Sequence, residues 1–272
     1  MSETNKVYWQ AHRGGGAHEA PDNTMGANRY AWGLGGIPEA DIRSTKDGVI
    51  ICLHDRTLAR TTNAPDEIKD VPVSELTFEE IRRWDAGVKF SESFAGEKVP
   101  SLEEMFAEMK GNPDRLAYLD LKEVDLRALG ELIDRYGVNG QVIFTHKIQD
   151  NCRSMKQIAR GVRTMQWIGG NPEQIRGTYL QLVENGFDGL DQIQFHLHSD
   201  SSGGDWPYAL KAEFLREALA VTKEAGVDFE VLPFAFDEDS IRMLLDIGIR
   251  WYATDEPARF LECVKKWQEA NR

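Results

Sequence analysis

Ionisable side chains gather at four points in the first half of the sequence, each at the end of a short apolar run. They are His12-Arg13, Glu39 with Asp41, His54-Asp55, and Asp120 with Lys122. Residues two apart on a strand point to the same side, so Glu39 and Asp41 share a face, as do Asp120 and Lys122. The pattern predicts one reactive site assembled from several strand ends.

Three of these residues, Glu39, Asp41 and Asp120, carry carboxylate oxygens. Such hard ligands suit one divalent cation, Mg²⁺ or Ca²⁺, better than zinc, and they leave coordination positions for substrate oxygens. Arg13, through its planar fork, and Lys122, as a point charge, can hold phosphate oxygens beside that cation. The residue types therefore predict a site for a small phosphate-bearing substrate.

The two histidines, His12 and His54, complete this chemistry. Phosphodiester cleavage needs one group to deprotonate the nucleophile and another to protonate the departing alkoxide, and imidazole titrates near neutral pH. We predict that they form the acid–base pair, without assigning the roles. The nucleophile is either water or a neighbouring substrate hydroxyl that would first give a cyclic phosphate.

Short β-rich runs alternate with longer helical patterns along the whole chain, which is typical of parallel strands joined by crossover helices. The predicted strands are Val7–Ala11, Ile37–Ile42, Val49–Leu53, Leu116–Leu121, Val142–Thr145, Arg163–Trp167, Gly189–Leu197, Asp228–Leu232 and Arg250–Ala253. This is one strand more than an eight-stranded barrel needs.

The surplus strand follows a turn. Ile42 and Val49 are separated by six residues that include Asp47-Gly48, a strong hairpin signal, and no helix fits between them. We therefore predict an α/β fold, a TIM-type (β/α)8 barrel with an extra antiparallel hairpin strand and a small insertion after the third strand. Residues 1–272 would form a single barrel domain, with 55–100 as the insertion over the active-site mouth.

Helix starts are predicted at the capping boxes Thr77–Glu80 and Ser101–Glu104, with further N-caps at Asp150, Asn171 and Asp239. Glycines are predicted to close several helices, where a left-handed residue is often needed. They are Gly130, Gly137, Gly186 and Gly226.

A longer set of motifs resembles the glycerophosphodiester phosphodiesterase family, within the phospholipase-C-like phosphodiesterases. The matching segments are His12-Arg13-Gly14, Pro21-Asp-Asn-Thr24, Glu39-Ala-Asp41, Thr45-Lys-Asp-Gly48, His54-Asp55-Arg56-Thr57-Leu58, Arg60-Thr-Thr62, Pro100-Ser-Leu-Glu103, Asp120-Leu-Lys122 and Thr254-Asp255-Glu256-Pro257. Their order and spacing agree almost from end to end.

The resemblance implies a TIM-type barrel that uses Mg²⁺ or Ca²⁺ and releases glycerol 3-phosphate and an alcohol, with a place in lipid and glycerol metabolism. It gives the acid–base, metal-binding and phosphate-binding roles to the residues assigned them above. The sequence departs from the family at Asp22 and Asp120, where glutamate is usual. It departs again at Glu230-Val-Leu-Pro-Phe234, on a face that usually borders the substrate, so the leaving group is expected to be unusual.

Further pocket candidates come from later strands. His146 ends the fifth strand, and Gln194 and His196 alternate along a strand whose inward face should otherwise be apolar, so all three are predicted to bind substrate. Asn23 is expected either to support the site or to help cap the first helix, and Asp255 is expected to cap the last helix.

Composition limits the partners. The formal net charge of -13 disfavours nucleic acid and anionic membranes, since both need a basic surface. No apolar leader or membrane span is predicted, so we expect a cytoplasmic protein with no stable membrane association. The three cysteines lack C-x-x-C spacing and are expected to be reduced and buried. The oligomeric state is not fixed by the sequence.

Two alternative functions follow from the same residues. One is a phosphodiesterase or cyclising lyase acting on a non-glycerol or lysolipid phosphodiester, similar to the sphingomyelinase D-like lyases, which have Asp at the position of Asp120. The other is a metal-dependent barrel aldolase or isomerase that stabilises an enolate, although this leaves His12, His54 and Arg13 less well explained.

Overall fold

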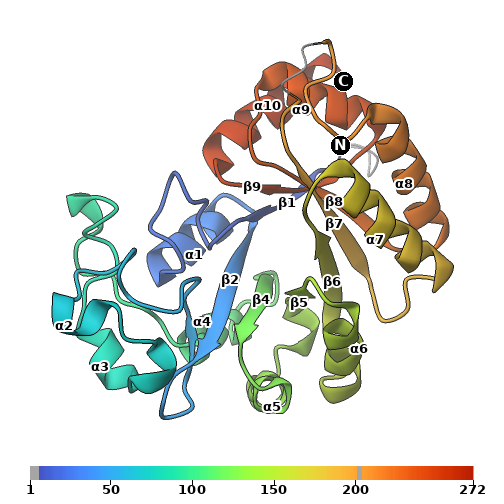
Figure 1. Cartoon of the computed structure of the whole chain (residues 1–272). Coiled ribbons are helices and arrows are strands. Elements are labelled where there is room, and N and C mark those ends of the chain that lie inside the picture. Colours follow the sequence, from blue (N-terminus) through green and yellow to red (C-terminus); the bar gives the residue numbers. More distant parts are fainter. Residues whose placement is uncertain (1–5, 201–203, 272) are drawn as a thin grey trace.

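The chain forms a closed barrel of parallel strands ringed by helices (Figure 1). A computed structural model describes residues 6–200 and 204–271. Within them the strands follow the order β1-β9-β8-β7-β6-β5-β4-β2, and a β1–β2 pairing closes the ring. The additional strand, β3, is outside this ring and pairs with β2 in the antiparallel direction. The predicted (β/α)8 barrel with an extra hairpin strand is therefore confirmed.

The strands are β1 Tyr8–Ala11, β2 Ile37–Ser44, β3 Ile50–Cys52, β4 Ala117–Glu123, β5 Val142–His146, β6 Arg163–Ile168, β7 Gln192–Leu197, β8 Asp228–Pro233 and β9 Trp251–Thr254. The α-helices are α1 Met25–Gly33, α2 Asp66–Lys69, α3 Phe78–Arg82, α4 Leu102–Lys110, α5 Leu126–Tyr136, α6 Gln149–Ile158, α7 Pro172–Glu184, α8 Ala212–Glu224, α9 Glu238–Ile247 and α10 Pro257–Ala270. Three single 3₁₀ turns, Val73–Glu75, Glu92–Phe94 and Asn139–Gln141, are also found in the described residues. The strand predicted to begin at Gly189 begins later, because Gly189 is in a turn with φ +77°.

The β2–β3 hairpin forms as the turn signal predicts. Gly48 has φ +79°, a conformation that glycine adopts without strain, and the Thr45 hydroxyl donates to Asp47 Oδ1 at 2.6 Å. Ile42 pairs with Cys52, and the Leu53 amide donates to the Asp41 carbonyl at 2.8 Å. The hairpin thus returns the chain to the carboxylates of β2, with His54 as the next residue.

Helix starts agree with the predictions at three positions and differ at two. Thr77, Ser101 and Asn171 each form a capping box. The predicted cap Asp239 is wrong, because Asp237 accepts the Ser240 amide instead and begins α9. Asp150 is also wrong, since it lies in the first turn of α6 after the N-cap residue Ile148.

Helix ends also agree in part. Gly137 closes α5 in the left-handed conformation, with φ +68°. Gly186 and Gly226, with φ +65° and +72°, follow α7 and α8. The prediction for Gly130 is wrong, because it lies inside α5, where a Cβ atom would be 2.3 Å from Ile158. Gly130 serves close helix packing rather than helix termination.

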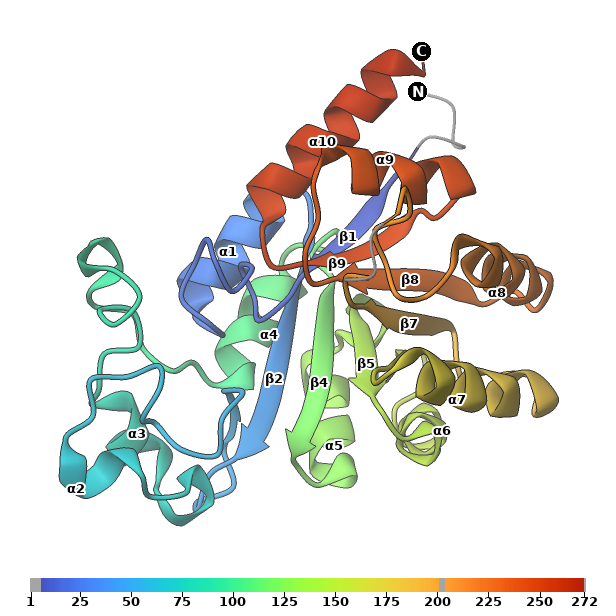
Figure 2. The same ribbon diagram turned by 45° about the horizontal axis from the view of Figure 1, so that its top comes forward.

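Apart from a group of four buried strand residues, Ile37, Tyr118, Ile143 and Met165, two separate apolar clusters pack the described residues together. The larger one fills the space between barrel and helices and contains all three buried free cysteines, Cys52, Cys152 and Cys263. The smaller one gathers Leu58, Val73 and Ile81 from the segment between β3 and α4 around Ile51 of β3. Figure 2 shows α2 and α3 of this segment on the outer side of β2. The segment therefore has a core of its own beside the strand that carries Glu39 and Asp41.

Candidate active site

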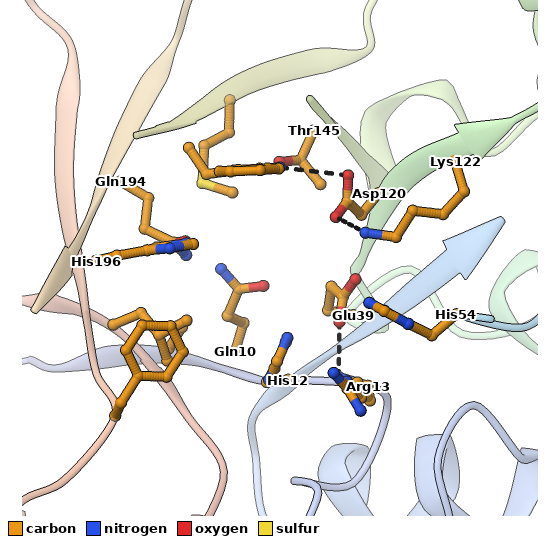
Figure 3. A pocket seen from close by; sticks show the side chains of 15 residues that line it. Gln10, His12, Arg13, Glu39, His54, Asp120, Lys122, Thr145, Gln194 and His196 are labelled. Atoms are coloured by element: carbon orange, nitrogen blue, oxygen red, sulfur yellow. Dashed lines mark hydrogen bonds and ion pairs between the residues drawn. The ribbon is translucent and has the colours of Figure 1, made fainter. Parts of the chain in front are cut away.

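A cavity of about 240 Å³ opens where the strands end (Figure 3). Its lining residues are Gln10, His12, Arg13, Glu39, His54, Asp120, Lys122, Thr145, Met165, Trp167, Gln194, His196, Leu232, Phe234 and Ala253. Each of the eight barrel strands, or the loop that follows it, contributes at least one of these residues. His54 follows the β2–β3 hairpin. Barrel enzymes build their active sites at this end.

The three predicted metal ligands lie together. Glu39, Asp41 and Asp120 each place one carboxylate oxygen within 4.8 Å of the others. Burial and then the Asp41 charge raise the pKa of Glu39 to about 8, and burial likewise raises the pKa of Asp120. Burial opposes ionisation of Asp41 too, but Lys122 and His54 outweigh it and hold the pKa of Asp41 low. Such crowding of acids in a buried place indicates a cation site.

Lys122 lies against this cluster. Its Nζ is 2.6 Å from Asp120 Oδ2 and 3.0 Å from Asp41 Oδ1. Burial would lower the pKa of Lys122, yet the charges of Asp41 and Asp120 raise it above its usual range. The ammonium is therefore always charged and borders the position where a phosphate would meet the carboxylates.

A strained turn after β1 fixes the next part of the site. Arg13 and Asn23 both have φ +57°, an uncommon conformation outside glycine, and the Asn23 amide donates to the Arg13 carbonyl at 2.7 Å. The turn aims the Arg13 amide at Glu39 Oε2, 2.6 Å away. Asn23 Nδ2 donates to Asp41 Oδ2 at 2.8 Å, so Asn23 holds a carboxylate, while Thr24 is the cap of α1.

His12 has a carboxylate partner from the far end of the chain. Its Nδ1 is 2.8 Å from Asp255 Oδ1. Burial opposes the charge on the ring, but the Asp255 hydrogen bond and the charges of Glu39, Asp255 and Asp41 outweigh it and raise the pKa of His12 to about 9. The prediction that Asp255 caps the last helix is wrong, because the N-cap of α10 is Glu256.

His54 has a similar partner, but from the adjacent residue. Its Nδ1 is 2.7 Å from Asp55 Oδ1, and the Arg43 guanidinium donates to the His54 carbonyl at 2.8 and 3.0 Å. Arg60 binds Asp55 Oδ2 at 2.6 Å and also Asp22, which in turn pairs with Arg13 at 3.1 Å. Both histidines thus use Nδ1 to bind an aspartate, which leaves Nε2 for a substrate.

The opposite wall of the cavity is aromatic and uncharged at its surface. The rings of Trp167 and His196 stack at 5.2 Å and 5°, and Phe234 meets His196 edge-on. Burial lowers the pKa of His196 to about 4, so its ring is neutral. His196 Nε2 is 3.2 Å from Gln194 Oε1. The predicted pocket residues Gln194 and His196 are therefore both in the cavity wall.

Below this wall lies a fully buried carboxyl group, Glu230. Gln10 and Gln194 each direct an amide NH₂ at Glu230 Oε2, at 2.9 and 3.0 Å, while Oε1 has no hydrogen-bond partner. Burial raises the pKa of Glu230 to about 8, against the opposing effect of both amides. Burial therefore favours the neutral form of this group, which orients the two amides that face the cavity.

One predicted pocket residue, His146, lies elsewhere, and so does the aromatic residue Trp251. His146 is not among the residues that line the cavity; its Nδ1 accepts the Ile148 amide at 3.1 Å and contacts Asn151 Nδ2 at 2.9 Å. The prediction that it lines the pocket is therefore wrong, because the start of α6 binds its ring. Trp251 stacks on Tyr8 at 4.3 Å where β9 and β1 begin, at the opposite end of the barrel.

Some site residues were missed in the sequence or placed only in part. Asp255 lies in a matching motif, which is a signal for a site role, but its helix-start position favoured capping. Glu230 lies between apolar neighbours in a predicted strand. An acidic residue at such a buried position was the signal in the sequence that could have indicated a role in the site. Trp167 lies in a strand at an inward position, yet an aromatic residue there fits a core equally well.

The comparisons with known proteins agree with this geometry. Residues 12–259 match the model of the glycerophosphoryl diester phosphodiesterase family. The chain belongs to this family, whose members are phosphoric diester hydrolases. This membership decides against the aldolase or isomerase alternative.

Relatives match over nearly the full chain. A glycerophosphodiester phosphodiesterase from Caldanaerobacter subterraneus is 30% identical over 94% of this chain and 97% of that protein. One from Bacillus altitudinis is 33% identical over 92% and 94%. The structure of a phosphodiesterase from Oleispira antarctica in complex with the product sn-glycerol-3-phosphate has a TM-score of 0.74 at 19% identity, covering 95% of this chain and 96% of that one. This last likeness concerns the fold.

Proposed function

We propose that this protein hydrolyses glycerophosphodiesters to glycerol 3-phosphate and an alcohol, in a metal-dependent reaction with two histidines as acid and base. The observation that carries the proposal is one cavity lined by Glu39, Asp120 and two histidines that each bind an aspartate, with Asp41 clustered beside the two carboxylates. Family membership supports the hydrolysis of a phosphodiester. The product named for the Oleispira protein, sn-glycerol-3-phosphate, supports cleavage that leaves the phosphate attached to glycerol.

The cation site fits the donors present. Glu39, Asp41 and Asp120 supply hard oxygens within 4.8 Å of one another. Burial raises the pKa of Glu39 and of Asp120, which supports a stabilising effect of a positive charge among them. Bound there, Mg²⁺ or Ca²⁺ would neutralise charge on the phosphoryl oxygens as it develops. The choice between the two ions is left to experiment.

The two histidines would act through Nε2. One ring takes a proton from the attacking hydroxyl as a bond forms to phosphorus; the other gives a proton to the alcohol oxygen as its bond to phosphorus breaks. The Asp255 and Asp55 carboxylates keep each Nδ1 protonated and each ring oriented. The net reaction adds one water across one P–O bond.

The phosphate oxygens would lie between Lys122 and the Arg13 turn. Lys122 Nζ borders two of the carboxylates, and Arg13 Nε is buried with no hydrogen-bond partner, so it is available to an incoming oxygen. Gln194 and His196 lie across the cavity and would contact the rest of the substrate. The charged and uncharged walls thus receive different parts of one molecule.

The test is a metal-reconstituted assay on a panel of glycerophosphodiesters, with glycerol 3-phosphate detected. We expect release that requires Mg²⁺ or Ca²⁺ and stops on chelation. Phosphorus NMR during turnover distinguishes water attack, which gives glycerol 3-phosphate directly, from attack by a substrate hydroxyl, which gives a cyclic phosphate first. Equal release in chelator and in metal would contradict the proposal.

Three sequence predictions remain proposals: a single domain over residues 1–272, the segment 55–100 as a cover of the mouth, and a cytoplasmic location. The contact of Arg60 with Asp55 and Asp22 supports the second, because it ties this segment to the site. In the residues that the structure describes, no helix is long and apolar enough to cross a membrane.

A further inference from the structure

A second cavity adjoins the catalytic one on the same end of the barrel. It has a volume of about 400 Å³ and lies between the start of α7 and the residues His198, Ala209 and Leu210, which follow β7 and precede α8. His196 lines both cavities and is their shared wall. A group bonded to the phosphate in the first cavity therefore needs to pass only one side chain to enter the second.

The lining of the second cavity is mostly apolar and contains no Asp, Glu, Lys or Arg. Pro172, Ile175, Ala209 and Leu210 form much of its lining. Asn171 also lines it, but the Asn171 Oδ1 already accepts the Gln174 amide at 2.9 Å as the cap of α7. An ionic or polyhydroxyl head group would find little here to replace its water, whereas a hydrocarbon would be stabilised.

Aromatic rings continue from one cavity to the other. Phe234 lines the catalytic cavity and stacks at 4.9 Å on His198, which lines the second. Gly169 leaves room for the shared ring, since a Cβ atom there would be 2.8 Å from His196 Nδ1. The His196 ring at the junction of the two cavities is neutral and stacks on Trp167, so it adds no charge where an apolar group would pass.

We infer that the second cavity binds the hydrocarbon portion of the leaving alcohol, so that the preferred substrates are glycerophosphodiesters of apolar alcohols. The inference rests on the proposed function and names its substrate class. The charged half of the catalytic cavity holds glycerol phosphate, and the alcohol oxygen leaves toward His196. The alkyl chain then lies against Ile175, Ala209 and Leu210.

The test uses a series of glycerophosphoalkanols from methyl to octyl with the metal-loaded protein. We expect kcat/KM to rise about threefold for each added methylene until the cavity is full, as burial of hydrocarbon predicts. A flat series with good turnover of the methyl substrate would overturn the inference and leave the proposed function standing. Absence of turnover on every member, methyl included, would overturn both.

Filling the cavity provides the decisive variant. Ala209→Phe should leave kcat/KM for the methyl substrate within twofold and lower it at least tenfold for octyl. Ala225→Phe is the matched control, because Ala225 is exposed at the end of α8. Pro172→Phe, on the exposed start of α7, fills the same space from another element should Ala209→Phe not fold.

Two results would place the alkyl group of the substrate outside this cavity or on the other side of the phosphate. If both filling variants keep the full rise from methyl to octyl, the alkyl group does not occupy this cavity. If they instead impair a substrate with an acyl chain on the glycerol and methanol as the alcohol, the cavity serves the glycerol side. Either result overturns the inference.

Discussion

The two halves of the catalytic cavity differ in chemistry and in how they are held. At the ends of β1, β2 and β4, charged groups lie within hydrogen-bond distance of one another, and a strained turn orients them. At the ends of β6, β7 and β8, the surface is made of stacked rings and amides above a buried neutral carboxyl group. The charged half suits a phosphate and a cation. The uncharged half suits whatever the phosphate is bonded to.

The family match spans both halves, from residue 12 to residue 259. The charged half carries the motifs by which the sequence resembles the family, whereas the uncharged half contains Glu230 and Phe234, in the segment that the sequence analysis expects to differ. Substitutions in the first half should therefore change the rate of chemistry, and those in the second should change which alcohol is accepted.

The largest effect is expected from the histidines of the charged half. His12→Ala or His54→Ala should lower kcat by about 10² to 10⁴, since each removes a proton-transfer group. Steady-state kinetics with saturating metal, beside thermal unfolding, checks this. His18→Ala is the control, because the His18 side chain is largely exposed and is not among the residues that line the cavity. Near-native activity in either variant would contradict the acid–base assignment.

A smaller loss is expected when only the orientation of His12 is disturbed. Asp255→Asn keeps the shape but weakens the hold on Nδ1, so kcat should fall about 10- to 100-fold with metal affinity unchanged. The pKa of His12 should fall with it, because Asp255 is a main cause of its rise. NMR titration of the ring measures this, with Asp239→Asn on the surface as control. An unchanged His12 pKa would contradict the positioning role.

A third variant replaces a histidine of the uncharged half, for comparison with the two histidines of the charged half. His196→Phe keeps a ring against Trp167 but removes the contact with Gln194. We expect less than about tenfold loss of kcat on glycerophosphomethanol, because the residue takes no part in proton transfer. The ranking of alcohols should change. A loss as large as that of His12→Ala would end the distinction between the two halves.

The smallest effect on turnover, but a clear one on stability, is expected at Glu230. Its folded pKa is raised from 4.5 to about 8, so its stabilising contribution is complete below pH 4.5 and is lost as pH rises toward 8. Glu230→Gln cannot ionise and should be equal to wild type near pH 5 and more stable near pH 8, by roughly 2 to 4 kcal/mol. Denaturant unfolding at both pH values measures the difference. A constant difference would contradict a buried, titrating Glu230.

The barrel and its charged half were predictable from sequence because their signals are local. Strand patterns, the Asp47-Gly48 turn and the pair spacing in Glu39-Ala-Asp41 each lie within a few residues. The N-cap residues were less predictable from sequence. Asp237 and Asp239 are equally suitable residue types for the N-cap of α9, and the backbone conformation decides which of them caps the helix.

The remaining features depend on contacts between distant residues. Asp255 meets His12 across 243 positions of sequence, and Glu230 meets Gln10 across 220. Periodicity and motif spacing carry no information on which distant side chains will touch. A lone acid in a strand therefore indicated something unusual, but its amide partners became visible only in the folded barrel.

The pairing of His12 with Asp255 also bears on how the enzyme is made. Synthesis proceeds from the N-terminal end, so the imidazole leaves the ribosome early and its carboxylate partner about 243 residues later. Until β9 joins β1, this dyad cannot exist, however complete the other strands are. Under the proposed mechanism, full turnover thus depends on closure of the whole ring, because a chain that ends before β9 lacks the carboxylate that orients His12.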